Sequence, residues 1–358
     1  MTVTVVHLIG SLDRGGAESV ALDLCRTIPS LRVRQTFLCL SGRAGSMANS
    51  FEAAGASVVT LPMSPLATFP FRLWRVLRSI APDALVSHVS VASGFMVLIA
   101  KIANVPRRIV RVHSSGDDRA DHGARRLYRW TARAMIALFA TAIYGVSRTS
   151  VSFAVGTWRG IAERRRIDVL VIPNGVDTDK FRPADGRDRG SDGVIVLYVG
   201  RASPEKNRAL LIPVHDELIS RRESSLWVVG PGGSDDLGAG VSDRVHLLGE
   251  RDDVALLMQR ADVLLLTSTR EGLPGVVLEA LSTDVPVVVS DIPSTRELSD
   301  RFAGISLVPV DAPASVWADA IEAHINHPSL TGALRRQLLN SAYGLHESAR
   351  VWEGLWSR

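Results

Sequence analysis

Short apolar runs alternate along the first half of the chain with segments whose apolar residues recur at helical spacing. Val20, Leu24 and Ile28 mark one such helical face. We expect the apolar runs to form strands: Val3 to Ile9, Thr36 to Leu40, Val58 to Leu61, Ala84 to Ser87, Arg108 to Val112, Ala142 to Val146 and Val169 to Ile172. Strands that alternate with helices predict a parallel, doubly wound sheet.

The second half of the chain repeats this pattern. Its expected strands are Val194 to Val199, Leu226 to Val229, Val245 to Leu248, Val263 to Thr267, Val285 to Val289 and Ile305 to Val308. A second parallel sheet is therefore predicted. The last segment, Leu334 to Trp356, is expected to be helical, with Leu338, Tyr343, Trp352 and Trp356 available for packing.

A polar, glycine-rich stretch separates the two patterns and is the best candidate for a linker. We predict a first domain at residues 1–182, a linker at residues 183–192 and a second domain at residues 193–340. With 46% hydrophobic and 22% charged residues among 358, the chain is expected to fold into globular domains and not to be disordered.

The two cysteines, Cys25 and Cys39, provide neither a zinc site nor a disulfide framework, which fits a reducing compartment. No basic, apolar leader opens the chain, and no apolar stretch reaches the roughly 20 residues of a spanning helix. We therefore expect a cytoplasmic protein.

Charge is distributed unevenly between the two halves. Residues 1–190 hold 26 Lys and Arg against 14 Asp and Glu, a net charge of +12, whereas residues 191–358 hold 15 against 23, a net charge of −8. The asymmetry predicts an anionic partner for the first half. An anionic membrane surface at the inner face, a polyprenyl pyrophosphate and a soluble anionic acceptor all remain open.

The arginine-rich stretch at residues 107–133 is the candidate anion-facing surface. Its alternative is a set of surface ion pairs with Asp117, Asp118 and Asp121. Nucleic acid is not an expected partner, because only Tyr128 and Trp130 offer aromatic platforms among these basic residues.

Two carboxylates in the second half frame the most informative stretch of the sequence. Glu271 opens the turn Gly272-Leu273-Pro274-Gly275, and Glu279 lies about two turns into the helix expected after it. The start of that helix presents backbone N–H groups, where anions bind readily. Two acids beside a phosphate-binding helix end suit a ligand with hydroxyl groups and phosphates, such as a nucleotide-sugar.

Cationic and glycine-rich loops follow the first strand of each half. Arg201 and Lys206 share the loop after Val194 to Val199, where both could neutralise a departing diphosphate. Gly15 and Gly16 allow close approach of the backbone to a ligand, although a tight turn explains them equally well.

His113 follows the strand that ends at Val112, at the edge where a parallel sheet presents reactive groups. His88 stands at the end of the preceding strand. Histidines in such positions are often structural, so both readings stay open at this point.

These residues together resemble retaining glycosyltransferases of family 4, which have the GT-B fold. The resemblance covers nearly the whole chain and rests on motifs that occur in the family's order. They are Gly15-Gly16-Ala17-Glu18, His113, Pro173-Asn174-Gly175-Val176-Asp177 with Phe181, Gly200-Arg201 with Glu205-Lys206-Asn207, Gly249, and Glu271 and Glu279 with Pro286-Val287-Val288. Asp284 departs from the pattern, because the family favours glycine there, and this puts the geometry of that turn in doubt.

The resemblance implies two facing Rossmann-like domains with a nucleotide-sugar, UDP- or GDP-linked, in the cleft between them. It also implies that the last helix, about residues 341–358, packs back on the first domain. Neither a cofactor nor a metal ion is expected. The reaction expected is transfer of a hexose, with retention, to a glycan, a lipid-linked acceptor or a small molecule.

Carried onto this sequence, the resemblance places Arg201 and Lys206 at the diphosphate and Glu279 at the ribose hydroxyls. Glu271 would lie beside the donor hexose, and His113 would hydrogen-bond the sugar near the reacting carbon. The remaining donor-binding positions implied are Gly15, Gly16, Gly200, Gly249, Gly272, Leu273 and Pro274.

Two other functions fit the same fold. A nucleotide-sugar epimerase would turn over its substrate without an acceptor, and a non-catalytic nucleotide-sugar-binding protein would show no turnover. A nicotinamide oxidoreductase is disfavoured, because neither half carries the Gly-x-Gly-x-x-Gly fingerprint in the required place.

Overall fold

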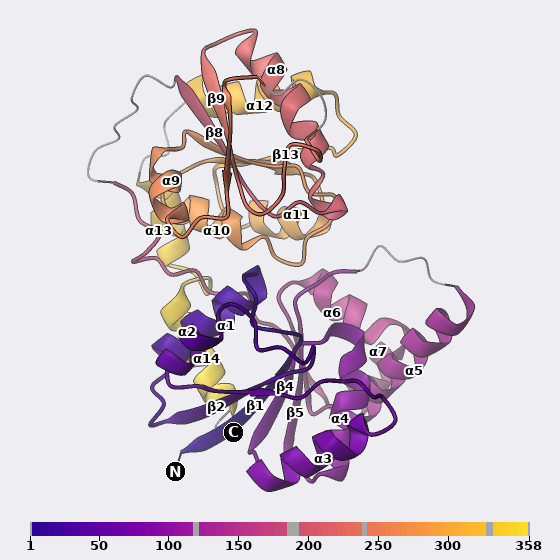
Figure 1. Ribbon diagram of the computed structural model, residues 1–358. Coiled ribbons are helices and arrows are strands. Elements are labelled where there is room, and N and C mark those ends of the chain that lie inside the picture. The colour runs from indigo at the N-terminus through magenta and orange to yellow at the C-terminus, as the bar shows by residue number, and fades with distance from the viewer. Residues whose placement is uncertain (1, 117–121, 185–192, 238–241, 327–331, 357–358) are drawn as a thin grey trace. The chain divides into compact units, whose positions relative to one another are not determined.

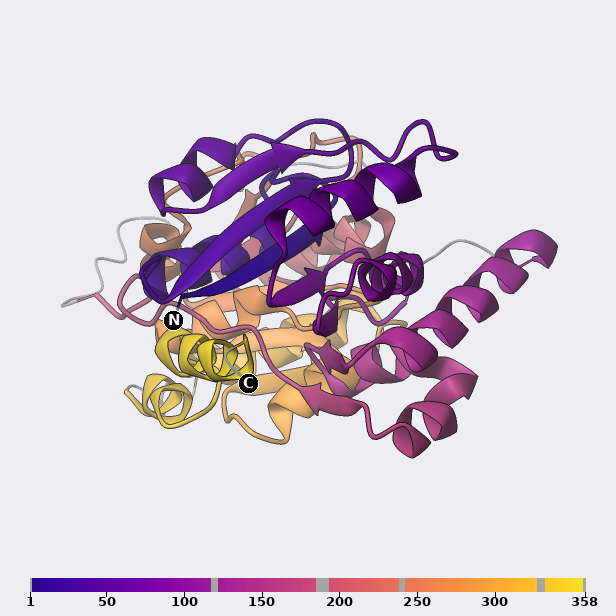
Figure 2. The same ribbon diagram turned by 90° about the horizontal axis from the view of Figure 1, so that it is seen from below.

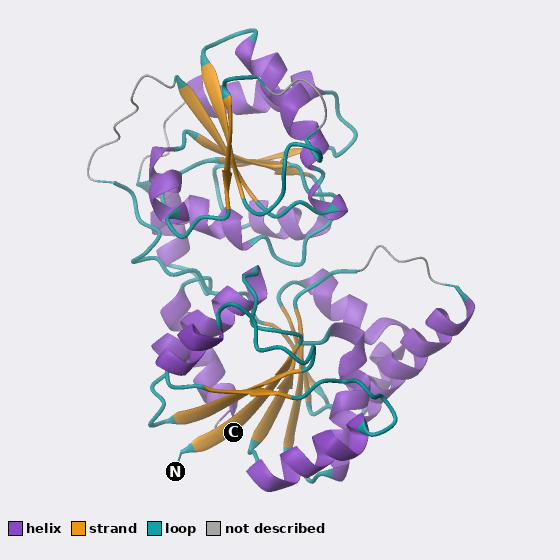
Figure 3. Cartoon of the chain, viewed as in Figure 1, coloured by secondary structure: helices purple, strands orange, loops and turns teal. Residues whose placement is uncertain are grey.

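The computed structural model describes residues 2–116, 122–184, 193–237, 242–326 and 332–356. It divides into two compact units. The first comprises Met1–Gly175 together with Leu345–Arg358, and the second comprises Val176–Gly344 (Figure 1). In each unit a layer of strands lies between helices (Figure 3).

The first unit contains a parallel sheet of seven strands in the order β3-β2-β1-β4-β5-β6-β7. The strands are β1 (Val3–Ile9), β2 (Val33–Cys39), β3 (Ser57–Thr60), β4 (Ala84–Ser87), β5 (Arg107–Val112), β6 (Ala142–Gly145) and β7 (Asp168–Val171). Each predicted strand is present, with ends shifted by a few residues. The central strands are buried on both faces, which is why they read as continuous apolar runs.

Helices cover both faces of this sheet. They are α1 (Gly16–Thr27), α2 (Ala48–Ala53), α3 (Phe69–Ile80), α4 (Ser93–Ile102), α5 (Gly123–Phe139), α6 (Arg148–Val155), α7 (Arg159–Arg164) and α14 (Leu345–Trp356). Val5 packs in a cluster with residues of α1 and α14, whereas its neighbour Val6 packs with residues of α3 and α4. Successive residues of a strand point to opposite faces, so these two helix pairs lie on opposite sides. Figure 2 shows α14, in yellow, beside α1.

The second unit contains a parallel sheet of six strands in the order β10-β9-β8-β11-β12-β13. They are β8 (Val194–Val199), β9 (Ser224–Val229), β10 (Val245–Gly249), β11 (Val263–Leu266), β12 (Val287–Ser290) and β13 (Ile305–Val308). Its helices are α8 (Leu211–Ile219), α9 (Val254–Arg260), α10 (Gly275–Ser282), α11 (Pro293–Ser299), α12 (Ala314–Asn326) and α13 (Ala333–Leu339). The predicted fold of two doubly wound parallel sheets is confirmed.

In both sheets the strand order reverses beside the first strand of the unit. The reversal lies between β1 and β4 in the first sheet and between β8 and β11 in the second. Loops on either side of such a point diverge to opposite faces and leave a crevice at the carboxyl ends of the strands. The sites described below stand at these two points.

The division between the units differs from the predicted boundaries. It falls at Gly175 and not at residue 182, because Phe181 is buried in the core of the second unit and its carbonyl oxygen accepts the Ser282 hydroxyl. Most of the predicted linker, residues 185–192, lies outside the described residues.

The predicted helical segment from Leu334 to Trp356 is present as two helices, α13 and α14, with an interruption that the prediction did not include. The chain is non-helical between α13 and α14, where Tyr343 accepts a backbone hydrogen bond of 2.8 Å from Val176 and Gly344 pairs with Val176 in a parallel bridge. This pairing lies at the end of the second unit, and α14 that follows belongs to the first unit.

Asp284 occupies a left-handed backbone conformation with φ of +57°. That conformation explains why glycine suits this position, and Asp is one of the few other residues that tolerate it. The Asp284 carboxylate accepts the backbone N–H of Arg335 in α13 at 3.0 Å. The turn between α10 and β12 therefore keeps a glycine-type geometry, and the carboxylate anchors the first turn of α13.

Candidate functional site

An ion pair between Lys206 and Glu271 stands at the carboxyl edge of the second sheet. The distance from Lys206 Nζ to Glu271 Oε1 is 2.6 Å, and the two side chains are 18% and 12% exposed. Lys206 follows β8 and Glu271 follows β11. These strands are neighbours at the point of reversal, so the topology brings together two residues that are 65 positions apart in the sequence.

Hydrogen bonds between the loop after β8 and the loop after β11 hold the segments that carry this pair. The backbone N–H of Thr269 donates to the Glu205 carbonyl at 2.8 Å, and the Thr267 hydroxyl donates to the Asn207 carbonyl at 3.0 Å. Asn207 has φ of +47°, a left-handed conformation that ends the short 3₁₀ turn Pro204–Lys206. The Lys206 backbone is thus fixed relative to the loop that carries Glu271.

Arg201 lies on the same loop as Lys206 but in a different environment. Its side chain is 64% exposed, and its guanidinium donates to Glu205 Oε1 at 3.2 Å. Tyr198, further back on β8, is buried beneath this loop, and a Cβ atom on Gly200 would lie 2.7 Å from its hydroxyl. Burial raises the pKa of Tyr198, so its hydroxyl stays protonated.

The predicted anion-binding helix end is α10, which begins at Gly275 after Gly272, Leu273 and Pro274. Pro274 has no N–H group, so donors at this end are limited to its neighbours. Glu279 lies little more than one turn into α10, and the predicted depth of two turns is wrong because the turn before the helix extends to Pro274. Glu279 is partly buried.

A buried cation near this edge, Arg208, was not predicted. Arg208 is 3% exposed, and its Nε lies 2.9 Å from Asp236 Oδ2 in the loop after β9. Its guanidinium also stands 5.9 Å from the centre of the Tyr198 ring. In that same loop, Gly230 donates its N–H to the Gly249 carbonyl at 2.8 Å. Arg208 therefore connects the loop after β9 to the start of α8. No pattern in the sequence indicated this role, because Arg208 is one of several charged residues in a polar segment.

In the first unit, Gly15 and Gly16 stand where β1 leads into α1. Gly15 is the N-cap residue in an extended conformation, and Gly16 is the first residue of the helix. A Cβ atom on Gly16 would meet no neighbour within 4 Å. The structure thus places these glycines at a helix N-terminus on the carboxyl side of β1, with open space above Gly16.

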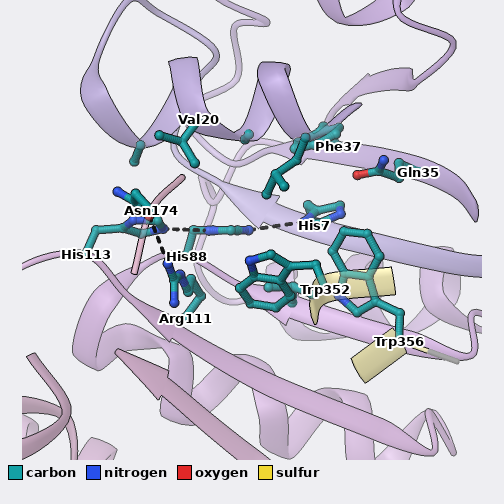
Figure 4. A pocket seen from close by; sticks show the side chains of 14 residues that line it. His7, Val20, Gln35, Phe37, His88, Arg111, His113, Asn174, Trp352 and Trp356 are labelled. Atoms are coloured by element: carbon teal, nitrogen blue, oxygen red, sulfur yellow. Dashed lines mark hydrogen bonds between the residues drawn. The ribbon is translucent and has the colours of Figure 1, made fainter. Parts of the chain in front are cut away.

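His113 belongs to a chain of three hydrogen-bonded imidazoles. Its Nε2 lies 2.9 Å from His88 Nδ1, and His88 Nε2 lies 3.1 Å from His7 Nδ1 (Figure 4). The rings are stacked, with centroids 5.2 Å and 5.4 Å apart. His7 lies in β1, whereas His88 and His113 directly follow β4 and β5. These three strands are adjacent in the sheet, so the rings meet at one edge. The sequence pattern indicates His88 and His113 as candidates, whereas His7 gives no such signal because it lies inside an apolar strand.

All three rings are kept neutral. Burial lowers the pKa of His7 to about 3 and of His113 to about 3, and it also holds the pKa of His88 well below its ordinary value. Arg111, which is 2% exposed, adds a positive charge that lowers the pKa of His113 further. The three histidines therefore form a hydrogen-bonded chain whose rings are uncharged at neutral pH.

Arg111 is fixed by Asn174 and Trp352. Its Nη2 donates to Asn174 Oδ1 at 2.8 Å, and its guanidinium lies 5.1 Å from the centre of the Trp352 ring. Asn174 comes from the Pro173-Asn174-Gly175 motif, so that motif supports the residues next to His113. The cavity lined by these groups, His113 and Trp356 has a volume of about 20 Å³, which holds one water molecule or one hydroxyl group but not a whole sugar ring.

The arginine-rich stretch does not form one exposed surface. Arg108 points inward and donates to the carbonyl oxygens of Phe139 and Val105, both at 2.7 Å, and Arg111 is buried as described. The predicted surface is wrong for these two residues, because they satisfy groups of the first unit. On α5, Leu127, Tyr128 and Trp130 are 62%, 44% and 51% exposed. Asp117, Asp118 and Asp121 lie outside the described residues.

Among the residues that the structure describes, no three His, Cys, Asp or Glu side chains form a group that could hold a metal ion. The expected metal independence stays a prediction. In the same described part of the chain, no helix is both long and apolar enough to cross a membrane.

Two family models match the chain. The "Glycosyl transferase 4-like domain" matches residues 15–175, and "Glycosyl transferases group 1" matches residues 193–327. The putative glycosyltransferase EpsF of Bacillus subtilis (strain 168) is 29% identical over 347 residues, which cover 88% of this chain and 86% of EpsF. The phosphatidyl-myo-inositol mannosyltransferase of Mycolicibacterium smegmatis is 34% identical over 224 residues, covering 59% of this chain and 54% of that enzyme.

Solved structures share the whole architecture. HepE of Anabaena, in a crystal structure with UDP-glucose, aligns with a TM-score of 0.79 at 20% identity, covering 99% of this chain and 100% of that chain. Two parallel-sheet units of this kind define the GT-B class of glycosyltransferases. The chain belongs to the group 1 glycosyltransferases with a family 4-like N-terminal domain, as the sequence motifs predicted.

Proposed function

We propose that this glycosyltransferase transfers a hexose from a nucleotide diphosphate sugar with retention of configuration. The observation that carries the proposal is the Lys206–Glu271 pair at the point of reversal of the second sheet, next to the N-terminus of α10. A cation, a carboxylate and a helix end within one crevice match the phosphates and hydroxyls of such a donor. HepE, which shares the fold, has been crystallised with UDP-glucose.

In this proposal Lys206 and Arg201 stabilise the diphosphate as it departs. Glu271 accepts hydroxyl groups of the hexose, and Glu279 accepts those of the ribose. The acceptor oxygen attacks from the face that the diphosphate leaves, and a phosphate oxygen of the leaving group takes the acceptor proton. No protein nucleophile is needed. Positive charge fixed in advance beside a developing negative charge lowers the barrier without reorganisation.

The donor is tested first by binding. Thermal unfolding is measured with UDP, GDP, UDP-glucose and GDP-mannose, since a ligand of the folded state raises its apparent stability. We expect one nucleotide family to raise the melting temperature and Lys206→Ala to reduce that shift. If no nucleoside diphosphate raises it, the proposed donor class is wrong.

Turnover then separates this function from its rivals. The bound donor is incubated with and without lipid-linked and soluble glycan acceptors, and the anomeric configuration of the product is read by NMR. We expect transfer only with an acceptor, with retained configuration and undiminished by EDTA. Donor epimerisation without an acceptor would indicate an epimerase, inversion would exclude the retaining mechanism, and restoration by Mg²⁺ after EDTA would exclude metal independence.

We further propose that the acceptor is a lipid-linked glycan or polyprenyl pyrophosphate and that the first unit docks on the inner, anionic face of a membrane. The support is the +12 charge of residues 1–190 and the exposed Leu127, Tyr128 and Trp130 on α5, next to the exposed Arg126. Aromatic side chains beside cations suit a headgroup region. Such docking would place the protein, otherwise cytoplasmic, at the membrane periphery.

A further inference from the structure

The hydrogen-bonding pattern of the three histidines couples their tautomers. A neutral imidazole has one N–H and one bare nitrogen. Each link joins Nδ1 of one ring to Nε2 of the next. If one ring carries its proton on Nε2, both of the others must do so as well, and the same holds for Nδ1. The chain therefore has two ordered states, and whatever favours one state at one end fixes His113 at the other.

Gln35 stands at the inner end of the chain. The Cys25 thiol lies 3.4 Å from Gln35 Oε1, and burial raises the pKa of Cys25, so the thiol stays protonated and donates. No described residue makes a hydrogen bond of ordinary length with His7 Nε2, yet Gln35 lies close enough to raise the pKa of His7 against the effect of burial. In Figure 4 the oxygen of the Gln35 amide is on the side facing His7. An acceptor at this end favours a proton on His7 Nε2.

His113 is the outer end of the chain. With the proton on Nε2 of every ring, His113 donates inward to His88 and its Nδ1 carries a bare lone pair. Within the described residues this Nδ1 is buried and has no hydrogen-bond partner. A buried acceptor without a donor is costly and calls for an explanation. A ligand hydroxyl that donates to Nδ1 would supply one.

We propose that His7 and His88 are positioning residues of the donor-sugar site: with Gln35 they fix His113 in the tautomer whose Nδ1 accepts a hydrogen bond from a hydroxyl group of the sugar. Burial, with a smaller contribution from the charge of Arg111, lowers the pKa of His113, keeps the ring neutral and so preserves the lone pair. The inference rests on the proposed function for its ligand, but the tautomers can be measured without any ligand. An acceptor nitrogen favours a neutral hexose over a hexuronic acid, because a carboxylate offers no proton.

The direct test is the ¹⁵N NMR pattern of the histidine rings in the full-length, unliganded protein at pH 7. Ring nitrogens with and without a proton resonate far apart, so each tautomer is read without substrate. We expect Nε2–H for His7, His88 and His113. A bound proton on His113 Nδ1 would overturn the assignment, whatever the enzyme transfers.

Two variants then interrupt the hydrogen-bonded chain of histidines at different places. Gln35→Met removes the inner acceptor, and His88→Phe keeps a ring of similar shape without nitrogens. We expect each to give His113 a mixed tautomer population. His215→Asn is the matched control, because His215 is a buried histidine of the second unit, 2% exposed, that does not belong to the chain. An unchanged His113 pattern in both chain variants would overturn the coupling.

The functional part is read from kinetics with UDP-glucose or GDP-mannose, whichever the enzyme uses. Losing one well-oriented hydrogen bond predicts a rise of about three- to tenfold in donor KM in both chain variants, with kcat within about twofold. Melting curves show whether each variant is folded. Folded variants with mixed tautomers and an unchanged KM would overturn the positioning role but not the chain itself. Failure of every donor to react would instead contradict the proposed function.

Discussion

The two sheets have the same topology at the point where their strand order reverses. The side chains that meet there are charged in the second unit and neutral in the first. At the point of reversal of the second sheet, Lys206 and Glu271 form a charged pair that is partly exposed. At the equivalent point of the first sheet, His7 and His88 form neutral hydrogen bonds in a buried chain. A charge near solvent keeps much of its hydration, whereas burial lowers the pKa of these two imidazoles and keeps them neutral at pH 7. The degree of burial of the side chains at each edge therefore decides whether that edge holds charged groups or neutral hydrogen-bonding groups.

The largest expected effect concerns Trp352, which packs against Arg111 next to the histidine chain. Trp352→Ala should destabilise the first unit by about 3–5 kcal/mol, because Trp352 is 3% exposed and covers Arg111 and Tyr144. Trp317→Ala, at a fully buried tryptophan of the second unit, is the matched control. Hydrogen exchange of each unit is the measurement. If Trp352→Ala lowered protection equally in both units, the assignment of Trp352 to the core of the first unit would be contradicted.

The charged edge is probed by Lys206→Ala. We expect turnover to fall by about 10² to 10³-fold, equivalent to about 2.7–4 kcal/mol, since a fixed cation beside the departing diphosphate is lost. Arg201→Ala should lower turnover less, because this side chain is 64% exposed and solvent screens its charge. Steady-state rates at saturating donor decide the matter. Wild-type rates in both variants would contradict the proposal that Lys206 and Arg201 stabilise the departing diphosphate.

The neutral edge predicts a pH dependence of stability. His7 and His113 have a pKa of about 3 when folded and about 6.5 when unfolded, so the unfolded chain binds more protons between these values. Stability of the first unit should therefore fall as pH falls through this window, by about 2 kcal/mol for each ring between pH 7 and pH 5. Chemical denaturation at both pH values measures it. His7→Phe should reduce the slope; an unaltered slope would contradict burial as its cause.

The smallest expected effect tests membrane docking. Arg126→Glu should weaken co-sedimentation with phosphatidylserine-containing vesicles, since each basic residue near such a surface contributes about 1 kcal/mol. Arg350→Glu, at a 77% exposed arginine on α14, makes the same change of charge away from α5. Binding should also weaken with salt and be absent with zwitterionic vesicles. Equal loss in both variants would point to net charge alone, and no binding at low salt would remove the membrane from the proposal.

Much of the architecture followed from the sequence by itself. Thirteen apolar runs predicted the strands of the two sheets. The signal is strongest for central strands such as β4 and β11, because strands buried on both faces must be continuously apolar and that requirement is local. The motifs containing Gly15, Lys206 and Glu271 predicted the family for the same reason: loops at the ends of strands carry their chemistry in short, contiguous segments. Asp284 read as a departure, and the structure shows that its turn is kept.

Tertiary structure alone decided which of these residues meet. The pairing of Lys206 with Glu271 depends on β8 and β11 being neighbours, an order that no local pattern specifies. His7 looked like one polar residue in an apolar strand until β1, β4 and β5 lined up and placed three rings in hydrogen-bonding distance. The break before α14 likewise depends on a pairing with Val176, far away in the sequence. The propensity of a segment to form a helix or a strand depends on residues that are close in the sequence. A functional site is formed by residues that are close in space. Strand order and burial decide which residues these are.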